Sequence, residues 1–153
     1  MRLTPASAAL ATAISLQSSQ VLGCDSNTVT ISTQTGPAIV DVEIADDSQE
    51  RAEGLSGRTS LAASSGMLFV YDERHRARFW MLGTKIALDM IIIEPDGTIS
   101  GIEHDVQPGT YWPKSGGSNV IAVLEINGGE AEDLGIRAND QVMHPMLNCE
   151  PSE

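Results

Sequence analysis

The order of apolar and polar positions predicts a domain built mainly from β-strands. Residues 38–44 alternate apolar and acidic side chains, with the two-residue period of a half-buried strand. Pro95-Asp96-Gly97 separates two apolar stretches and is typical of a hairpin turn, because Pro presets the first turn residue and Gly accepts a left-handed backbone. Short apolar runs bounded by turn residues predict further strands at 67–71, 78–81, 88–94, 98–106, 120–126 and 141–143.

Two short helices are predicted beside these strands. Residues 46–48 supply N-caps and Glu50 is placed to complete a capping box, so we expect a helix to about Leu55, ended by Gly54 and Gly57. A second helix over 127–135 would be capped by Gly135. The predicted fold is mainly β, a small sandwich or jelly-roll-like antiparallel barrel with one or two short helices.

The same pattern divides the chain into four parts. We predict a single β domain over 38–146, a polar linker over 24–37 that is compatible with a short strand at 28–32, and a loose tail over 147–153. Residues 1–23 are typical of a secretory signal, with Arg2 followed by an apolar stretch over 8–16 that is too short to span a bilayer. We therefore expect an exported protein, periplasmic or attached to the envelope.

Cys24 and Cys149 leave two outcomes open. Val21-Leu22-Gly23-Cys24 resembles a lipoprotein signal, in which Cys24 would be the lipidated first residue, although Leu22 fits that signal poorly. If Cys24 is not lipidated, it could pair with Cys149 in an oxidising compartment and join the two ends of the domain.

The charge balance limits the partners. The chain has 9 Lys and Arg against 21 Asp and Glu, a formal net charge of -12. Such a surface repels phosphate backbones and anionic membranes, so we expect no nucleic-acid partner and membrane contact only through a lipid on Cys24. We also expect a monomer.

Several segments occur in the order found in a known family. They are Val42-Glu43-Ile44-Ala45, Glu50-Arg51-Ala52-Glu53-Gly54-Leu55, Gly66-Met67-Leu68-Phe69, Phe79-Trp80-Met81 with Thr84, Leu88-Asp89 and Leu134-Gly135-Ile136. This arrangement resembles the family called "domain of unknown function 192". The resemblance implies a small β domain with short helices, often exported, whose activity is unassigned. The family often has Lys, Asn and Pro where this chain has Leu82, Gly83 and Ala87, so a role of that Lys or Asn does not transfer.

Asp89 is an acid within an apolar strand. It shares a face with Ile91 and Ile93, and a three-residue hairpin loop would place it opposite Glu103, whereas a two-residue loop would place it opposite His104. Glu125, inside the apolar run 120–126, is a third carboxylate for this neighbourhood. These acids indicate either a carboxylate site for cation binding or acid–base work, or structural acids bonded to backbone amides or arginines.

Aromatic and basic residues supply the candidate binding surface. Arg78 precedes Trp80 in a chain with only two Trp, and the Gly-rich loop after residue 108 carries two more aromatics. Trp80 could instead belong to the core, and the basic loop could simply offset nearby acids. The candidate binding residues are Arg78, Trp80, Thr84, His104, Tyr111 and Trp112.

Three functional hypotheses follow. The sequence contains no nucleophile elbow, P-loop, dinucleotide fingerprint or zinc-ligand spacing, so we expect no metal and no cofactor. The leading hypothesis is a non-catalytic envelope module that binds a small molecule, glycan or protein. The alternatives are a carboxylate-dependent hydrolase or isomerase that uses Asp89 with Glu103 or Glu125, and a structural or assembly factor of the envelope.

Overall fold

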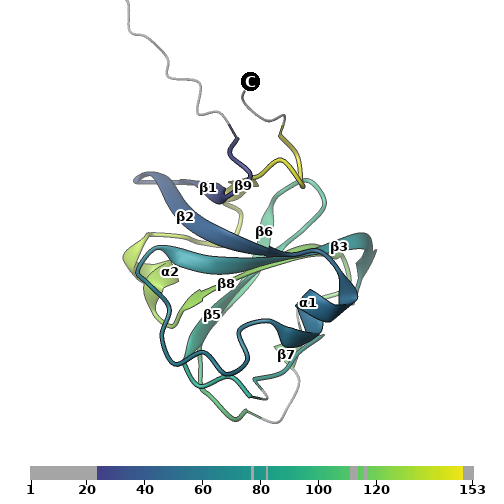
Figure 1. Ribbon diagram of the computed structural model, residues 1–153. Helices are drawn as coiled ribbons and strands as arrows, with labels where there is room; N and C mark the ends of the chain where they lie inside the picture. Colours follow the sequence, from purple (N-terminus) through teal and green to yellow (C-terminus); the bar gives the residue numbers. More distant parts are fainter. Residues whose placement is uncertain (1–23, 77, 82, 111–113, 116, 150–153) are drawn as a thin grey trace, which may run out of the picture.

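The main element of the fold is one curled β-sheet, seen in the computed structural model of Figure 1. The structure describes residues 24–76, 78–81, 83–110, 114–115 and 117–149. Within them it has these elements: β1 (Thr28–Thr33), β2 (Gly36–Ala45), α1 (Ser48–Glu53), β3 (Ser65–His75), β4 (Arg78–Phe79), β5 (Leu88–Ile93), β6 (Ile99–Val106), β7 (Lys114–Ser115), β8 (Val120–Asn127), α2 (Glu130–Asp133) and β9 (Gln141–Met143).

The strand order brings the two edges of the sheet together. Within the described residues the sheet runs β6-β5-β8-β3-β2-β1-β9, and β4 pairs separately with β7. Beside the start of β6, Thr98 forms a bridge with Gln141 of β9, whose side-chain amide donates to Thr98 Oγ1 at 2.7 Å. The curled sheet and short helices confirm the predicted mainly-β class. The antiparallel expectation is wrong for β2 and β3, which pair in parallel because α1 and its following loop cross over between them.

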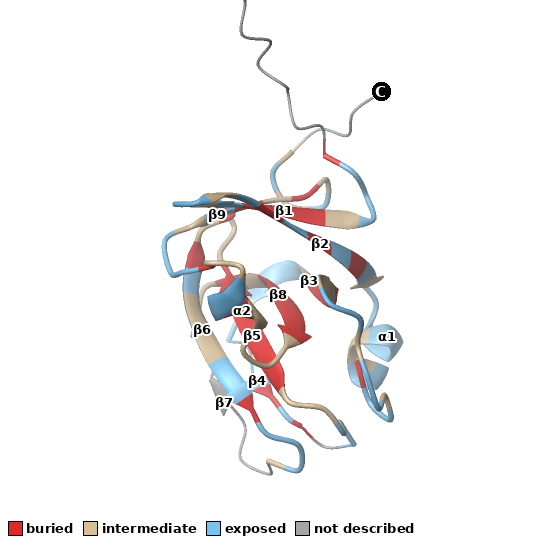
Figure 2. Cartoon of the chain, turned by 90° about the vertical axis from the view of Figure 1, so that its left-hand side faces the viewer, coloured by how far each residue is buried: buried red, intermediate tan, exposed pale blue. Residues whose placement is uncertain are grey.

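Each face of the central strands carries its own apolar cluster. The two-residue period sends Leu124 and Ile126 of β8 into one cluster and Val123 into the other. Figure 2 shows the buried residues concentrated on β3, β5 and β8. The candidate site lies on the face of the second cluster, which includes Met67, Phe69, Phe79, Met81, Met90 and Val123.

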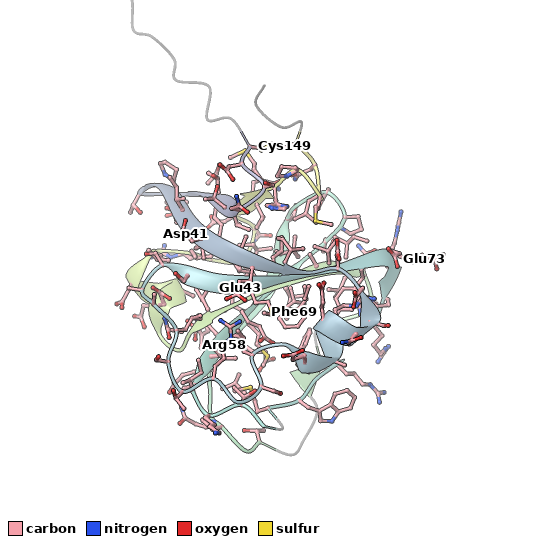
Figure 3. The ribbon with its side chains drawn as sticks, viewed as in Figure 1. Asp41, Glu43, Arg58, Phe69, Glu73 and Cys149 are labelled. Carbon is pink, nitrogen blue, oxygen red and sulfur yellow. A yellow bond between two sulfur atoms is a disulfide. The ribbon has the colours of Figure 1, made fainter. Side chains whose placement is uncertain are left out.

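Helix α1 forms where its capping residues predict it. The Asp47 carboxylate accepts from the amides of Gln49 and Glu50, and Glu50 accepts from the Asp46 amide in return. After α1, both terminal nitrogens of Arg58 donate hydrogen bonds to the Glu43 carboxylate of β2. The two side chains point toward each other in Figure 3. This pair anchors the crossover loop to the sheet, and its hydrogen bonds lower the pKa of Glu43.

The predicted linker and tail are partly wrong. Residues 28–33 form β1, where Val29 and Ile31 are fully buried between β2 and β9. The residues before β1 also contact the domain, since Cys24 is buried and the Asn27 carbonyl accepts from the Val42 amide. At the other end, Leu147 packs on the first cluster and the Asn148 amide donates to the Val142 carbonyl. Residues 150–153 and the predicted signal segment 1–23 lie outside the described residues.

A disulfide between Cys24 and Cys149 ties the two ends of the domain together. Their Cα atoms lie 6.2 Å apart and 125 positions separate them in sequence. Of the two outcomes open for Cys24, the structure contains the disulfide. None of the helices in the described part of the chain has the length and apolar character that crossing a bilayer requires.

Candidate functional site

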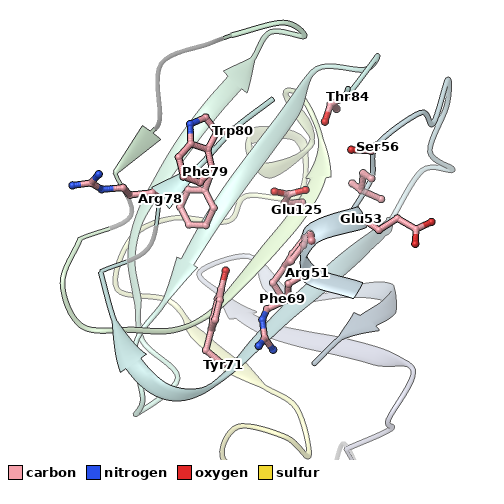
Figure 4. A pocket seen from close by; sticks show the side chains of 13 residues that line it. Arg51, Glu53, Ser56, Phe69, Tyr71, Arg78, Phe79, Trp80, Thr84 and Glu125 are labelled. Atoms are coloured by element: carbon pink, nitrogen blue, oxygen red, sulfur yellow. The ribbon is translucent and has the colours of Figure 1, made fainter. Parts of the chain in front are cut away.

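A cavity of about 540 Å³ opens beside α1, with β8 beneath it (Figure 4). Its polar floor is Glu125, which is 8% exposed, and Trp80 at its margin is 59% exposed. The lining comes from four parts of the chain, namely α1 and the loop after it, β3, the β4 region and β8. The lining residues are Arg51, Ala52, Glu53, Gly54, Leu55, Ser56, Phe69, Tyr71, Arg78, Phe79, Trp80, Thr84 and Glu125.

Glu125 is a buried acid in apolar surroundings. The register of β8 places it directly between Met67 of β3 and Met90 of β5, and both methionines are buried. Burial raises the pKa of Glu125 to about 7, because the carboxylate loses water without gaining a compensating charge. The side chain therefore exchanges a proton near neutral pH.

Aromatic rings form much of the wall around Glu125. Phe69 and Phe79 are buried, whereas Tyr71 is half-buried and Trp80 is exposed. Burial raises the pKa of Tyr71; the nearby Arg51 lowers that pKa in part, and Glu125 raises it by a smaller amount than Arg51 lowers it. The phenol therefore stays neutral and can donate a hydrogen bond.

Arg51 fixes α1 against this wall. Its guanidinium lies 5.1 Å from the centre of the Tyr71 ring, and Nη1 donates to the Val70 carbonyl at 2.7 Å and also to the Asp46 carbonyl. Across the cavity margin, the Gly57 amide donates to the Gly83 carbonyl at 2.9 Å and joins the loop after α1 to the loop after β4. These contacts set the distance between the two loops.

Asp89 lies on the other face of the sheet from Glu125. It pairs with Ile126 of β8, is fully buried, and points into the first apolar cluster as predicted. Its carboxylate accepts from three backbone amides: Asp105 at 2.7 Å, Gly129 at 3.0 Å and Ala131 at 2.9 Å. Asp89 therefore holds the end of β6 and the start of α2 in place, which is the structural interpretation of this acid.

The predicted register of the hairpin is correct only near its turn. Ile93 pairs with Ile99, as a three-residue loop requires. A register shift between Ile92 and Ile93 then moves the pairing by one residue, so Met90 rather than Asp89 lies opposite Glu103. A second shift lies between Leu88 and Met90. Asp89 instead faces the bulge in which Asp105 has a left-handed backbone, with φ of 46°. The proposed pairing of Asp89 with Glu103 is wrong for this reason, and its pairing with Glu125 is wrong because the two side chains lie on opposite faces of the sheet. The bulge places His104 and Asp105 opposite Asp89, and the hydrogen bonds to the Asp89 carboxylate come from backbone amides.

The structure brings four of the predicted site residues together. Arg78, Trp80, Thr84 and Glu125 all line the cavity. Glu103 lines a separate hollow of about 310 Å³ and His104 is exposed at the β6 bulge. The predicted binding residues Tyr111 and Trp112 lie outside the described residues.

Sequence reasoning missed several lining residues, above all Arg51, Phe69 and Tyr71. A signal was present, since three of the segments that carry the family resemblance, 50–55, 66–69 and 79–84, each contribute to the lining. Their convergence requires the parallel β2–β3 crossover, which the pattern of the sequence did not predict.

Fold and cavity together define a small, mainly-β domain with a cavity above a buried acid on one face of its curled sheet. The chain belongs to the family DUF192, described as "Uncharacterized ACR", whose model matches residues 29–144. This confirms the resemblance inferred from the sequence segments. Comparison with curated proteins found no match.

Two solved structures share the fold. One, a protein of unknown function from Novosphingobium aromaticivorans DSM 12444, is 37% identical, with a TM-score of 0.74 over 76% of this chain and 83% of that chain. The other, from Sinorhizobium meliloti 1021, carries the provisional description of a transcription regulator. It is 33% identical, with a TM-score of 0.75 over 78% of this chain and 94% of that chain.

Proposed function

We propose that this protein is an exported, non-catalytic binding module whose small-molecule ligand occupies the cavity above Glu125. The observation that carries the proposal is the cavity itself, in which a buried carboxylate lies beneath aromatic walls. Its volume falls within the range of about 300–1,000 Å³ that is usual for small-molecule sites. A few polar groups among apolar walls, here Glu125, Tyr71 and Thr84, are the usual means of orienting a ligand.

Export is supported by the disulfide. Bridges such as Cys24–Cys149 persist in oxidising compartments and are rare in a reducing cytosol. The signal-like character of residues 1–23 supports the same location, in the periplasm or at the envelope.

Transcription regulation by DNA binding does not transfer to this chain from its Sinorhizobium relative. A net charge of -12 opposes contact with phosphate backbones, which requires clustered Lys and Arg. Within the described residues, the cavity lining holds two arginines and two carboxylates, so this part of the lining offers no basic patch either.

Ligand-observed NMR with a small-molecule library tests the binding function. We expect hits whose affinity falls about tenfold in Trp80→Ala, since truncating an aromatic anchor typically costs more than 1 kcal/mol. Met146→Ala, which shortens another exposed apolar side chain, is the matched control and should bind like the wild type. Hits that bind all three proteins equally would show that the cavity is not the site.

A carboxylate-dependent hydrolase or isomerase is the second candidate. Glu125 favours it, because an acid with a pKa of about 7 can donate and accept protons at neutral pH. The original pairing with Asp89 is not part of this candidate, since the two acids lie on opposite faces. Chromogenic ester and glycoside substrates test it: turnover that disappears in Glu125→Gln and persists in Glu73→Gln, an exposed acid outside the lining, would replace the non-catalytic proposal.

An envelope assembly role remains a prediction with a separate test. Affinity purification of the intact protein from envelope extracts would yield a stoichiometric protein complex under that hypothesis. A small-molecule module would be recovered alone.

A further inference from the structure

We propose that the ligand presents a protonated aliphatic amine to Glu125. This inference rests on the proposed binding function and specifies its ligand class. A buried carboxylate that faces a cavity has two ways to become satisfied, which are to stay protonated or to receive a positive charge. The surroundings of Glu125 favour the second when a ligand is present.

Within the described residues, the Glu125 carboxylate has neither a hydrogen-bond partner nor an ion-pair partner. Its strand neighbours are Met67 and Met90, and burial alone accounts for its raised pKa. Asp89, buried to a similar degree, has three backbone amide donors. The contrast shows that this fold can satisfy a buried acid internally, yet leaves Glu125 open to the cavity.

The aromatic side chains that line the cavity suit a cationic ligand better than a neutral one. Phe69, Tyr71, Phe79 and Trp80 line the same cavity, and the faces of aromatic rings attract ammonium groups. An ammonium group in this cavity can therefore pair with the Glu125 carboxylate and contact aromatic rings, whereas a neutral hydroxyl or carbonyl forms no ion pair.

The arginines of the lining do not occupy this position. Among the residues whose side chains are described, the charged and titratable groups that line the cavity are Tyr71 on β3, Arg51 and Glu53 on α1, Arg78 on β4, and Glu125 itself. Figure 4 shows both guanidinium groups directed away from the Glu125 carboxylate. Arg51 is held by the Asp46 and Val70 carbonyls, and Arg78 is exposed, where water screens its charge.

An organic cation fits better than a metal ion. No group of three or more His, Cys, Asp or Glu side chains within the described residues could hold a metal. Calcium takes about six to eight oxygen ligands, which a single carboxylate does not supply. A primary amine needs only one carboxylate and an aromatic surround.

Matched probe pairs test the inference by isothermal titration calorimetry. Each pair joins an amine to its neutral counterpart: benzylamine with benzyl alcohol, cyclohexylmethylamine with cyclohexylmethanol, and 6-amino-6-deoxyglucose with glucose. For the pair whose shape fits, we expect the amine to bind at least about tenfold more tightly, as a buried charge pair implies.

The pH dependence gives the sign of the interaction. Only the ionised carboxylate pairs with ammonium, and its fraction rises through a pKa of about 7. The affinity of the amine should therefore rise about tenfold from pH 6 to pH 8. A ligand that accepts a hydrogen bond from protonated Glu125 would show the opposite slope.

Glu125→Gln should abolish both the preference for the amine and the pH slope. Glu73→Gln, which removes an exposed carboxylate of β3 outside the cavity lining, should retain both and is the matched control. Thermal melts of both variants verify folding. Equal affinity within the pairs, or a falling slope with pH, overturns the amine inference and leaves the binding function standing. Absence of binding by every probe, together with an empty library screen, overturns the binding function itself.

Discussion

Two buried acids of the same sheet, Asp89 and Glu125, have opposite surroundings. Three backbone amides donate hydrogen bonds to the Asp89 carboxylate, and these bonds offset the cost of burying the acid. Glu125 has methionines on both neighbouring strands and opens toward the cavity. The first arrangement stabilises a fold and the second costs stability, which is the usual mark of a site kept for a ligand.

Asp89→Asn tests the structural role. The amide group keeps the size of the side chain but weakens the charge-assisted hydrogen bonds to Asp105, Gly129 and Ala131. We expect a loss of about 2–4 kcal/mol in the free energy of unfolding, measured by urea denaturation. Asp41→Asn, at an exposed position of β2, should change it little. A full loss of ligand binding in a still-folded Asp89→Asn protein would instead place Asp89 in the site.

Glu125→Gln tests the cost of the second acid. The pKa of about 7 in the folded protein lies above the ordinary value of 4.5, so the protonated form is favoured on folding. Stability from this group is fully present below about pH 4.5 and is lost as pH rises through 7. The ligand-free wild type should then be less stable than Glu125→Gln by up to about 3 kcal/mol at pH 8, with the difference vanishing near pH 4. Urea denaturation across this range measures it, and a constant difference would refute the assignment.

At the scale of the elements, the sequence predicted features that depend on neighbouring residues and did not predict features that depend on contacts across the sheet. The cap at Asp47 and the turn at Pro95-Asp96-Gly97 depend on neighbours in sequence, and both form as predicted. The bulges of β6 depend on what Asp89 and α2 require across the sheet, so the alternation of residues carries no sign of them. For the same reason the sequence identified Trp80 and Glu125 as candidates but not the wall contributed by Arg51.

Gly66 is the element-scale determinant of how closely β3 approaches β8. A Cβ at this position would lie 2.4 Å from the Glu125 carbonyl oxygen and 2.9 Å from Ile126 Cγ2. Gly66→Ala must therefore move β3 away from β8, the strand that carries Glu125. We expect it to lower the free energy of unfolding by about 2–3 kcal/mol. Gly101→Ala is the matched control, because its nearest neighbour is Ile92 Cδ1 at 3.9 Å. Equal chemical denaturation midpoints for the two variants would contradict the steric argument.

At the scale of the whole molecule, the termini and the cavity occupy different ends of the sheet. Figure 1 shows the first and last described segments of the chain beside β1 and β9, with β7 near the opposite end. The pairing of Cys24 with Cys149 was one of two outcomes that the sequence left open, because sequence alone does not show whether β1 and the segment after β9 are neighbours. The folded sheet brings β1 and β9 together and so places the two thiols within bonding distance.

The disulfide should therefore govern stability and leave the cavity intact. Closing a chain of 125 residues restricts the unfolded state, which the chain-entropy model values at about 4–5 kcal/mol. Cys24→Ser with Cys149→Ser, or reduction of the native protein, should lower the unfolding free energy by that amount. Probe affinity at Glu125 should be unchanged while the protein is folded. Intact mass of the mature protein, before and after reduction, checks that the bridge forms in cells. A diacylglyceryl mass on Cys24 would exclude the bridge, and stability that is indifferent to reductant would show that the ends are held by packing alone.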